Sequence, residues 1–374
     1  MGNNPLLKLQ EYGQSIWLDY LHRQSLNSGE LLQMIETDGI RGVTTNPQIF
    51  QKAIGDSEVY NDAIRELARQ GQSAEEIYQV LIVEDVRRAA DLFRPLYDKS
   101  DGHHGFVSLE VNPHLAHDTG RTIEEARQFW RLLARPNVFI KVPATKAGLP
   151  AIRQLISEGI NVNVTLLFGL PRYRAVAEAF IDGLEDRVER GGALTRLASV
   201  ASFFLSRIDL LIDPQLEEKI KAGSEQAEMA SRLRGQIAIA SAREAYQIYK
   251  EIFSSPRFEK LTGHGGRPQR VLWASTSTKN PDYSDVKYVE TLIGPETVNT
   301  VPMETLKAYR DHGQPAARLE EDPAQARGML ADLAQVGIDL DQATRQLEEE
   351  GVEKFIQPYD QLLQILAERR GAGS

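Results

Sequence analysis

The 374-residue sequence contains no cysteine, no long apolar segment and no excess of basic residues. Without cysteine the chain can form neither disulfide bonds nor thiolate metal sites, although the redox compartment is left open. No segment approaches the roughly 18 consecutive apolar residues of a membrane span. The first residues, MGNNPLLKLQEYGQ, lack the apolar core of a secretory signal. We therefore expect a cytoplasmic protein that does not interact with membranes.

The charge balance is acidic, with 43 lysine and arginine residues against 53 aspartate and glutamate residues and a formal net charge of -10. Such a charge keeps a protein soluble and repels polyanions, because like charges on the two partners oppose their approach. We therefore expect no nucleic-acid partner.

Short apolar runs alternate with amphipathic stretches through most of the chain. The runs are rich in Val, Ile and Phe, which suits strands covered on both faces, and they span 15–20, 42–47, 106–111, 137–142, 161–167, 197–205, 270–276 and 296–301. Between them, stretches such as 122–134 have the spacing of crossover helices, here behind a threonine cap. The pattern predicts a (β/α)8 barrel, and an open doubly wound sheet is the structural alternative.

The domain organisation follows from the same pattern. We expect a single barrel domain over 1–374, because nothing forces a boundary and single α/β barrels reach this length. Helical insertions are expected near 51–105, with at least two helices, and near 214–269. The second insertion is predicted to hold one long helix and a loop that begins SSPRFEKLTGHGG. A helical C-terminal extension is expected after residue 303.

Polar side chains stand at the carboxyl ends of the predicted strands, where the active sites of (β/α)8 barrels lie. In strand order they are Asp19, Asn46, Glu110, Lys141, the pair Asn163 and Thr165, and Ser202, which is paired with the apolar Phe204. Within each pair, two-residue alternation places both side chains on one face of the strand. We expect these residues to form one site.

Lys141 interrupts the apolar run 137–142 near its end. An amine that attacks a carbonyl must be neutral, yet a lysine with an unperturbed pKa near 10.4 is neutral in only about one molecule in several thousand at pH 7. Burial in an apolar strand is expected to lower that pKa, and an ionised Glu110 would oppose the effect. Together with Glu110 and Asp19, this lysine predicts amine catalysis rather than a metal site.

Two alternatives to a catalytic Lys141 remain open. The side chain could reach solvent from the strand end, or it could form a buried ion pair with Glu110 or Asp19. Lys146, five residues further on, is the rival for a covalent role. It lies outside the apolar run, so it lacks a desolvating environment and is expected to stay charged.

The segments that carry these residues resemble the transaldolase family, in particular its longer bacterial form. The resemblance covers nearly the whole chain through SIWLDYLHR, IRGVTTNPQIF, SLEVNPHLAHDT, NVFIKVPAT, INVNVTLLF, SVASFFLSRID, ASTSTKNP and GVEKFIQPYDQLL. It implies a (β/α)8 barrel with extra helices and a class I aldol transfer that uses neither a metal nor an organic cofactor. A dihydroxyacetone unit would move from sedoheptulose 7-phosphate or fructose 6-phosphate to glyceraldehyde 3-phosphate or erythrose 4-phosphate, in the non-oxidative pentose phosphate pathway.

The resemblance also implies catalytic roles for four residues. Lys141 matches the lysine that forms the Schiff base with the ketose C2 carbonyl. Glu110 matches the carboxylate that acts through a water, which Thr165 helps to place. Asp19 matches the base that takes the proton of the C4 hydroxyl during cleavage and returns it during addition.

Substrate-binding roles are implied in the same way. Asn46 and Asn163 match residues that hold the dihydroxyacetone hydroxyls, and Ser202 and Arg207 match the phosphate site. Lys279 stands where shorter members of the family carry an arginine. Lys279 keeps the positive charge of that arginine but lacks the guanidinium fork that binds a phosphate through two nitrogens. The alternative interpretation is that Lys279 is a solvated lysine of the loop.

Two other functions remain open, namely a fructose 6-phosphate aldolase that releases free dihydroxyacetone and a non-catalytic sugar phosphate-binding protein. The resemblance places Phe204 where related hydrolytic aldolases carry a tyrosine, which favours transfer. The set Lys141, Glu110 and Asp19 argues against a binding protein, because a sensor would not need a neutral lysine. We expect small sugar phosphates as partners and a monomer or a homodimer.

Overall fold

The structure is a computed structural model and describes residues 4–223 and 226–372. Over these residues eight parallel strands close into a barrel in sequence order, with β8 returning to pair with β1. The strands are β1 (Gln14–Asp19), β2 (Gly42–Thr44), β3 (Phe106–Glu110), β4 (Val138–Pro143), β5 (Val162–Leu167), β6 (Ser199–Phe204), β7 (Arg270–Ala274) and β8 (Thr297–Val301). Each overlaps one predicted run, so the barrel prediction is confirmed and the open sheet is wrong.

The barrel interior is packed and is not an open channel. Trp17, Phe106 and Phe139 come from three different strands, and the rings of Phe106 and Phe139 stack with centroids 4.3 Å apart. Gly42 on β2 makes room for this cluster, because a Cβ there would lie 2.6 Å from ring carbons of Trp17. With the interior filled, a ligand site must lie at one end of the barrel.

Strand register sets polar residues side by side at the C-terminal end. Glu110 of β3 pairs with Lys141 of β4, and Lys141 pairs with Asn163 of β5. On the other side, Asp19 of β1 pairs with Thr44 of β2. Because paired residues in parallel strands lie at one level, the register brings these chemical groups together.

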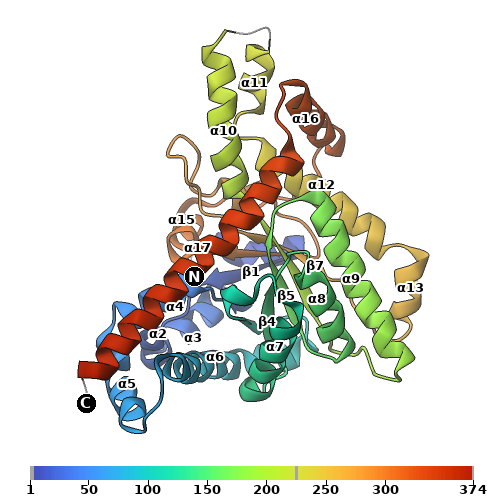
Figure 1. The fold of residues 1–374 in the computed structure, drawn as a ribbon. Coiled ribbons are helices and arrows are strands. Elements are labelled where there is room, and N and C mark those ends of the chain that lie inside the picture. The colour runs from blue at the N-terminus through green and yellow to red at the C-terminus, as the bar shows by residue number, and fades with distance from the viewer. Residues whose placement is uncertain (1–3, 224–225, 373–374) are drawn as a thin grey trace.

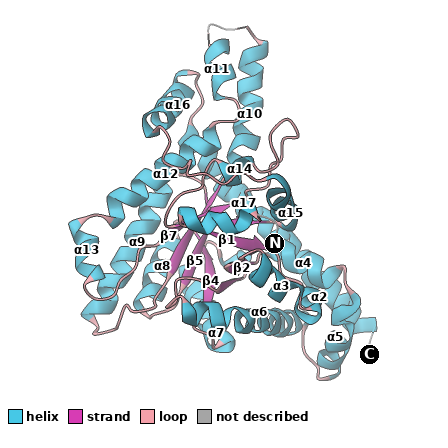
Figure 2. Cartoon of the chain, turned by 180° about the vertical axis from the view of Figure 1, so that it is seen from behind, coloured by secondary structure: helices cyan, strands magenta, loops and turns pink. Residues whose placement is uncertain are grey.

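Helices surround the strands, which lie at the centre of the molecule in Figure 2. The connecting helices are α2 (Arg23–Ser28), α3 (Glu30–Thr37), α6 (Ala74–Lys99), α7 (Thr119–Leu133), α8 (Gly148–Ser157), α9 (Leu170–Glu189), α12 (Ile237–Phe253) and α14 (Lys287–Glu290). The predicted cap of the 122–134 helix is wrong. Asp118 caps α7 by accepting from the backbone of Arg121 at 3.0 Å, whereas Thr122 lies inside the helix and donates its hydroxyl to the Leu115 carbonyl.

The two insertions are helical. The interval 51–105 contains the end of α4 (Pro47–Gly55), the 3-10 helix η2 (Glu58–Tyr60), α5 (Asn61–Arg69) and α6. The interval 214–269 contains the end of α10 (Ser206–Lys221), then α11 (Ala227–Leu233), α12 and α13 (Pro256–Thr262). One long helix and a loop were predicted for the second interval. The long helix is present as α12, but α11 and α13 were not predicted, and α13 occupies the first part of the predicted loop. Ser255 caps α13 by accepting from the Phe258 backbone at 3.3 Å, so a serine-proline pair that suggested a turn instead begins a helix.

The remaining elements lie at the two ends of the chain, except η3, which follows β3. They are α1 (Pro5–Lys8), η1 (Leu9–Tyr12), η3 (Pro113–Leu115), α15 (Met303–His312), α16 (Pro323–Gln335) and α17 (Leu340–Ala372). The long helix α17 runs across the molecule in front of the strands in Figure 1 and contacts α4, α6, η3 and α10. Because α4, η3 and α10 directly follow strands β2, β3 and β6, α17 crosses the C-terminal face of the barrel.

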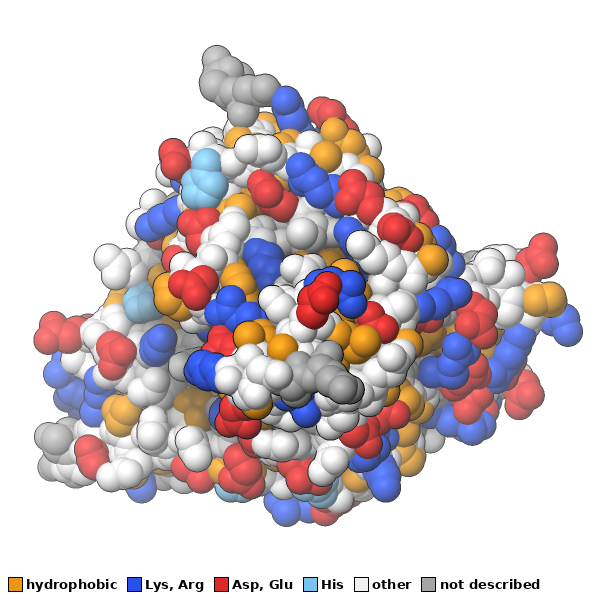
Figure 3. Space-filling view, turned by 90° about the horizontal axis from the view of Figure 1, so that it is seen from above, with side chains coloured by type: hydrophobic (Ala, Val, Ile, Leu, Met, Phe, Trp, Pro, Cys, Tyr) orange, Lys and Arg blue, Asp and Glu red, His pale blue; other side chains and the backbone are white. Residues whose placement is uncertain are grey.

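The surface carries acidic and basic side chains that are interspersed rather than segregated, as the face in Figure 3 shows. Within residues 4–223 and 226–372, none of the helices combines the length and the apolar character that crossing a bilayer requires.

Candidate active site

A cavity of about 530 Å³ opens at the C-terminal ends of the strands, beside α17. The predicted site residues that line it are Asp19, Asn46, Lys141, Ser202, Phe204, Arg207 and Lys279. Glu110, Asn163 and Thr165 do not line the cavity; they are buried in the strands next to it. The structure therefore gathers residues from strands far apart in the sequence around one cavity.

Lys141 is the buried lysine of this cavity, with only 4% of its surface exposed. Its Nζ donates a hydrogen bond to the Thr45 carbonyl at 3.0 Å and lies 3.7 Å from Oε2 of Glu110. Lys52 and Lys279 also line the cavity, but both are exposed. Lys146 is exposed as well and faces a different depression between α9 and α17. The geometry therefore favours Lys141 over Lys146 for covalent chemistry.

Glu110 is buried, and burial raises its pKa from 4.5 to about 7. The positive charge of Lys141 opposes this shift, and the nearby Asp19 adds to it. Neither carboxylate oxygen has a hydrogen-bond partner among the described residues, and neither does the buried hydroxyl of Thr165. A carboxyl group with a pKa near neutrality can both give and take a proton at physiological pH.

Thr165 lies at an irregular point of β5. The pairing of β5 with β6 shifts register between Val164 and Leu167, and the intervening Leu166 has a φ of 54°. A bulky residue in the left-handed region costs roughly 1–3 kcal/mol and persists only where the surrounding structure requires it. Bulges are common next to active sites, and this one adjoins Thr165.

Asp19 stands at the end of β1, is partly exposed and borders the cavity. Its Oδ1 accepts a hydrogen bond from the Thr44 hydroxyl at 2.6 Å, and the same hydroxyl lies 2.6 Å from that of Thr300 on β8. Burial raises the pKa of Asp19, while Lys141 and the Thr44 hydroxyl act to lower it. The carboxylate is thus held in a fixed orientation by two neighbouring strands.

Two asparagines are oriented by hydrogen bonds. Asn163 donates its amide to the Ser108 hydroxyl at 3.0 Å and accepts from the Ser202 hydroxyl at 2.7 Å. Asn46 follows β2 and caps α4, because its Oδ1 accepts from the Ile49 backbone at 3.0 Å. The amide nitrogen of Asn46 is therefore the group that remains for a ligand in the cavity.

A basic group marks one side of the cavity. Arg207 begins α10 next to Phe204, with its guanidinium carbon 5.7 Å from the ring centroid, and its buried Nη1 has no hydrogen-bond partner among the described residues. Lys279 donates from Nζ to the Ser277 hydroxyl at 2.7 Å. The backbone enters this loop through Ser275, which has a φ of 54°. Two cations within one cavity can bind a phosphate group.

Comparison with known proteins agrees with this geometry. Residues 16–366 match the model of the family described as Transaldolase/Fructose-6-phosphate aldolase. The chain belongs to this family. Among curated relatives of the transaldolase family, Transaldolase 2 of Nostoc sp. is 46% identical over 98% of this chain and 97% of its own length. The Transaldolase of Parafrankia sp. is 47% identical over all of both chains, and that of Thiobacillus denitrificans is 48% identical over 94% of this chain and 96% of its own. The protein is therefore an enzyme of the transaldolase type.

Reasoning from strand ends missed several residues of this transaldolase-family cavity. Thr44 holds Asp19, the Thr300 hydroxyl bonds that of Thr44, and Phe355 of α17 borders the cavity next to Lys141. Thr44 belongs to the segment GVTTNP and could have been found by the same strand-end reasoning. Nothing local to residue 355 indicates that it meets residue 141.

Proposed function

We propose that the protein transfers a dihydroxyacetone unit between sugar phosphates through a Schiff base on Lys141. The donors are sedoheptulose 7-phosphate or fructose 6-phosphate, and the acceptors are glyceraldehyde 3-phosphate or erythrose 4-phosphate, as in the non-oxidative pentose phosphate pathway. The observation that carries the proposal is the buried Nζ of Lys141, 3.7 Å from Glu110 and in a cavity that Asp19 also lines.

The reaction begins at Nζ of Lys141, whose neutral amine attacks the C2 carbonyl of the ketose. Glu110 supplies the proton that the departing hydroxyl needs, acting through a water that Thr165 helps to place, and an iminium forms. The raised pKa of Glu110, about 7, supports this role because the group carries a proton in a large fraction of molecules at neutral pH.

Cleavage follows at the bond between C3 and C4. Asp19 takes the proton of the C4 hydroxyl, the C3–C4 bond breaks, and its electron pair moves toward the iminium to give an enamine. The aldose phosphate leaves, and the acceptor aldehyde takes its place. The enamine C3 then attacks the acceptor carbonyl, Asp19 returns the proton, and water releases the new ketose phosphate. No step requires a metal or an organic cofactor.

The binding roles are those that the family resemblance implies, and for Asn46 and Arg207 they are supported by groups that the structure leaves available. Asn46 and Asn163 hold the hydroxyls of the dihydroxyacetone unit, which keeps the enamine in place until the acceptor arrives. Arg207 and Lys279, with Ser202 nearby, bind the phosphate group that each donor and each acceptor carries. The unpartnered Nη1 of Arg207 supports this assignment.

The proposal is tested by reducing the enzyme with borohydride in the presence of fructose 6-phosphate and mapping the modified peptide by mass spectrometry. We expect a dihydroxyacetone adduct on Lys141, with Lys146→Arg as a control that keeps it. The Asp19→Asn variant should still form an adduct with the intact ketose, while its turnover falls about 10²- to 10⁴-fold. An adduct on Lys146, or no adduct at all, would contradict the proposal.

The alternative activity, fructose 6-phosphate aldolase, is separated by assaying with and without an acceptor. Transfer predicts fast product formation only when erythrose 4-phosphate is present. Fast release of free dihydroxyacetone without any acceptor would support the aldolase instead. A protein that binds sugar phosphates but neither forms an adduct nor turns over would be the non-catalytic binding protein.

A further inference from the structure

We propose that Phe355 on α17 is a specificity-determining residue that keeps solvent away from the Schiff base on Lys141 and so favours transfer over release of free dihydroxyacetone. The inference rests on the proposed function, because it concerns the fate of the enamine formed there. It assigns a role in the site to the C-terminal helix, which contributes no strand to the barrel.

The ring of Phe355 lies directly beside the reacting nitrogen. Its centroid is 5.6 Å from Nζ of Lys141, and both side chains line the same cavity. Phe355 is 5% exposed and Lys141 is 4% exposed. The ring therefore occupies space next to the amine that water would otherwise fill.

The position of Phe355 is fixed by close packing of α17 on the barrel. Gly351 precedes it by four residues and so lies on the same face of the helix. A Cβ at Gly351 would lie 3.1 Å from Cδ2 of Leu166 on β5 and 3.5 Å from Cε2 of Phe168. The absence of a side chain at Gly351 thus lets α17 approach the strand ends closely enough for the ring to reach Lys141.

Tyr359, four residues after Phe355, continues this face of α17. Its hydroxyl accepts a hydrogen bond from the Asn112 amide at 3.1 Å, and its ring meets that of Tyr78 edge to face with centroids 5.3 Å apart. Asn112 follows β3 and Tyr78 lies on α6. Contacts on both sides of Phe355 therefore hold it over the cavity, which a mobile loop would not do.

The side reaction that this ring would suppress needs only water. If C3 of the enamine takes a proton from water instead of attacking an acceptor, the iminium of dihydroxyacetone forms. The remaining hydroxide adds to C2, the proton of the new hydroxyl passes to Nζ as the C2–Nζ bond breaks, and free dihydroxyacetone leaves. The net reaction consumes one water, so excluding water next to Nζ slows it.

Removing the ring should spare the productive hydration steps. Those steps use the water that we propose Glu110 activates, and Glu110 contacts Lys141 from the neighbouring strand β3 and not from α17. The ratio of release to transfer is therefore the quantity that Phe355 controls.

The test compares Phe355→Ala, which opens the space, with Phe355→Leu, which keeps most of the volume without a ring. Release of free dihydroxyacetone from fructose 6-phosphate is measured without acceptor, and transfer is measured with erythrose 4-phosphate. We expect the ratio of release to transfer to rise about tenfold or more in the alanine variant and less than about threefold in the leucine variant. In D2O the released dihydroxyacetone should carry one carbon-bound deuterium. Leu363→Ala, a half-buried position further along α17, is the matched control and should leave the ratio unchanged.

The outcomes separate this inference from the proposed function. If the wild-type enzyme forms the borohydride-trapped adduct and transfers, but Phe355→Ala leaves the ratio unchanged, the inference is wrong and the function stands. If the wild-type enzyme forms no adduct, the proposed function fails. Should the alanine variant not fold, Phe355→Val, with an intermediate volume, must give an intermediate ratio. A ratio equal to that of the wild type in the valine variant would overturn the inference.

Discussion

Glu110 is the residue at which burial and charge oppose each other most directly. Lys141, 3.7 Å away, favours the ionised carboxylate, whereas burial and the negative charge of Asp19 favour the protonated form. Burial prevails, and the pKa rises from 4.5 to about 7. The Glu110 carboxyl is thus available as an acid at neutral pH. The folded state becomes less stable when this carboxyl ionises.

Replacing Glu110 with glutamine should change how stability depends on pH. A raised native pKa means that Glu110 holds its proton more tightly in the folded state than in the unfolded state. The contribution of this proton to folding stability is therefore fully present below about pH 4.5 and is lost as pH rises through about 7. Glutamine stays neutral. We expect Glu110→Gln to gain about 2–3 kcal/mol over the wild type between pH 5 and pH 8, measured by urea unfolding at both values. The exposed Glu66→Gln serves as control, and equal pH dependence in Glu110→Gln and the wild type would refute the assignment.

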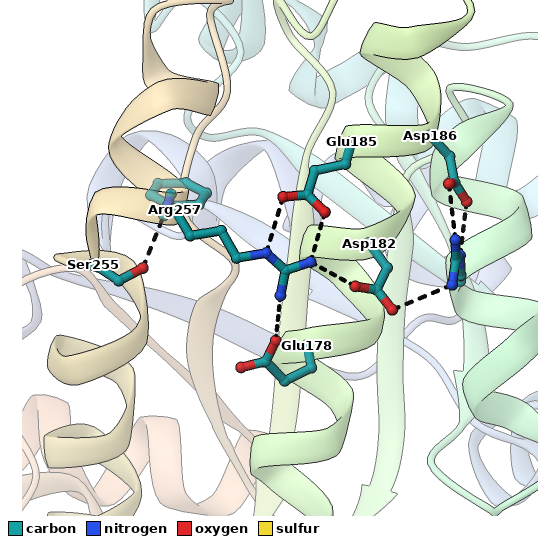
Figure 4. Close-up of polar contacts among 8 residues, drawn as sticks. Glu178, Asp182, Glu185, Asp186, Ser255 and Arg257 are labelled. Carbon is teal, nitrogen blue, oxygen red and sulfur yellow. Dashed lines mark hydrogen bonds and ion pairs between the residues drawn. The ribbon is translucent and has the colours of Figure 1, made fainter.

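At the scale of elements, charge pairs join the short helix α13 to the long helix α9 (Figure 4). The guanidinium of Arg257 bonds Glu178, Asp182 and Glu185 at 2.5–2.9 Å, and Arg153 of α8 bonds Asp182 at 3.4 Å from the other side. The acidic residues stand at helical spacing on one face of α9, where their like charges would repel each other without the arginines. The network therefore stabilises the packing of α8, α9 and α13.

Removing Arg257 should weaken this packing in a salt-dependent way. Its side chain is 40% exposed, so solvent screening reduces the effect, and we expect Arg257→Ala to lose about 1 kcal/mol of stability at low salt. The loss should shrink near 0.5 M salt, because screening also weakens the carboxylate repulsion. Arg174→Ala breaks a single exposed pair with Glu251 and is the matched control, with a smaller expected loss. Urea unfolding at two salt concentrations measures both, and a salt-independent loss for Arg257→Ala would count against the network.

At the scale of the whole molecule, α17 ties together parts of the chain that are far apart in sequence. It contacts α10 and β5, and from its middle it supplies Phe355 to the cavity. Near its end, Arg369 donates to the carbonyls of Ile54 and Gly55 at 2.9 and 2.6 Å. These carbonyls lie at the end of α4, on the opposite side of the barrel mouth. Attachment at both sides fixes the helix across the face.

Releasing the far end of α17 should therefore loosen the helix without opening the barrel. We expect Arg369→Ala to speed amide hydrogen exchange in the last turns of α17, while the exchange of strands such as β4 stays as in the wild type. The cause is the loss of charge-assisted hydrogen bonds from Arg369 to the carbonyls of Ile54, Gly55 and Ser57. The exposed Gln364→Ala is the control. Unchanged exchange in the last turns would show that Arg369 does not anchor the helix.

The positions of the strands and seven of the residues that line the cavity could be predicted from the sequence. Apolar runs such as 137–142 are local signals, and parallel strands bring their carboxyl ends to the same edge, which is why Asp19 and Lys141 could be placed in one site. Weaker local signals are less reliable. The segment SSPRFEKLTGHGG was predicted to be a loop, but a serine-proline pair occurs both in turns and at the start of helices, and α13 begins at Pro256.

The sequence by itself determined where the eight strands lie, because burial on both faces requires apolar runs and each run can be recognised without its neighbours. Closure of the sheet into a barrel was the favoured prediction, and the pairing of β8 with β1 decided it. Only the tertiary structure decided that Lys141 lies 3.7 Å from Glu110, that burial prevails over that charge at Glu110, and that Phe355 covers the amine. These facts depend on strand register, which pairs Glu110 with Lys141, and on the path of α17, which brings Phe355 to a residue more than 200 positions away. No local pattern encodes such a distance, because it is set by how all the elements pack together.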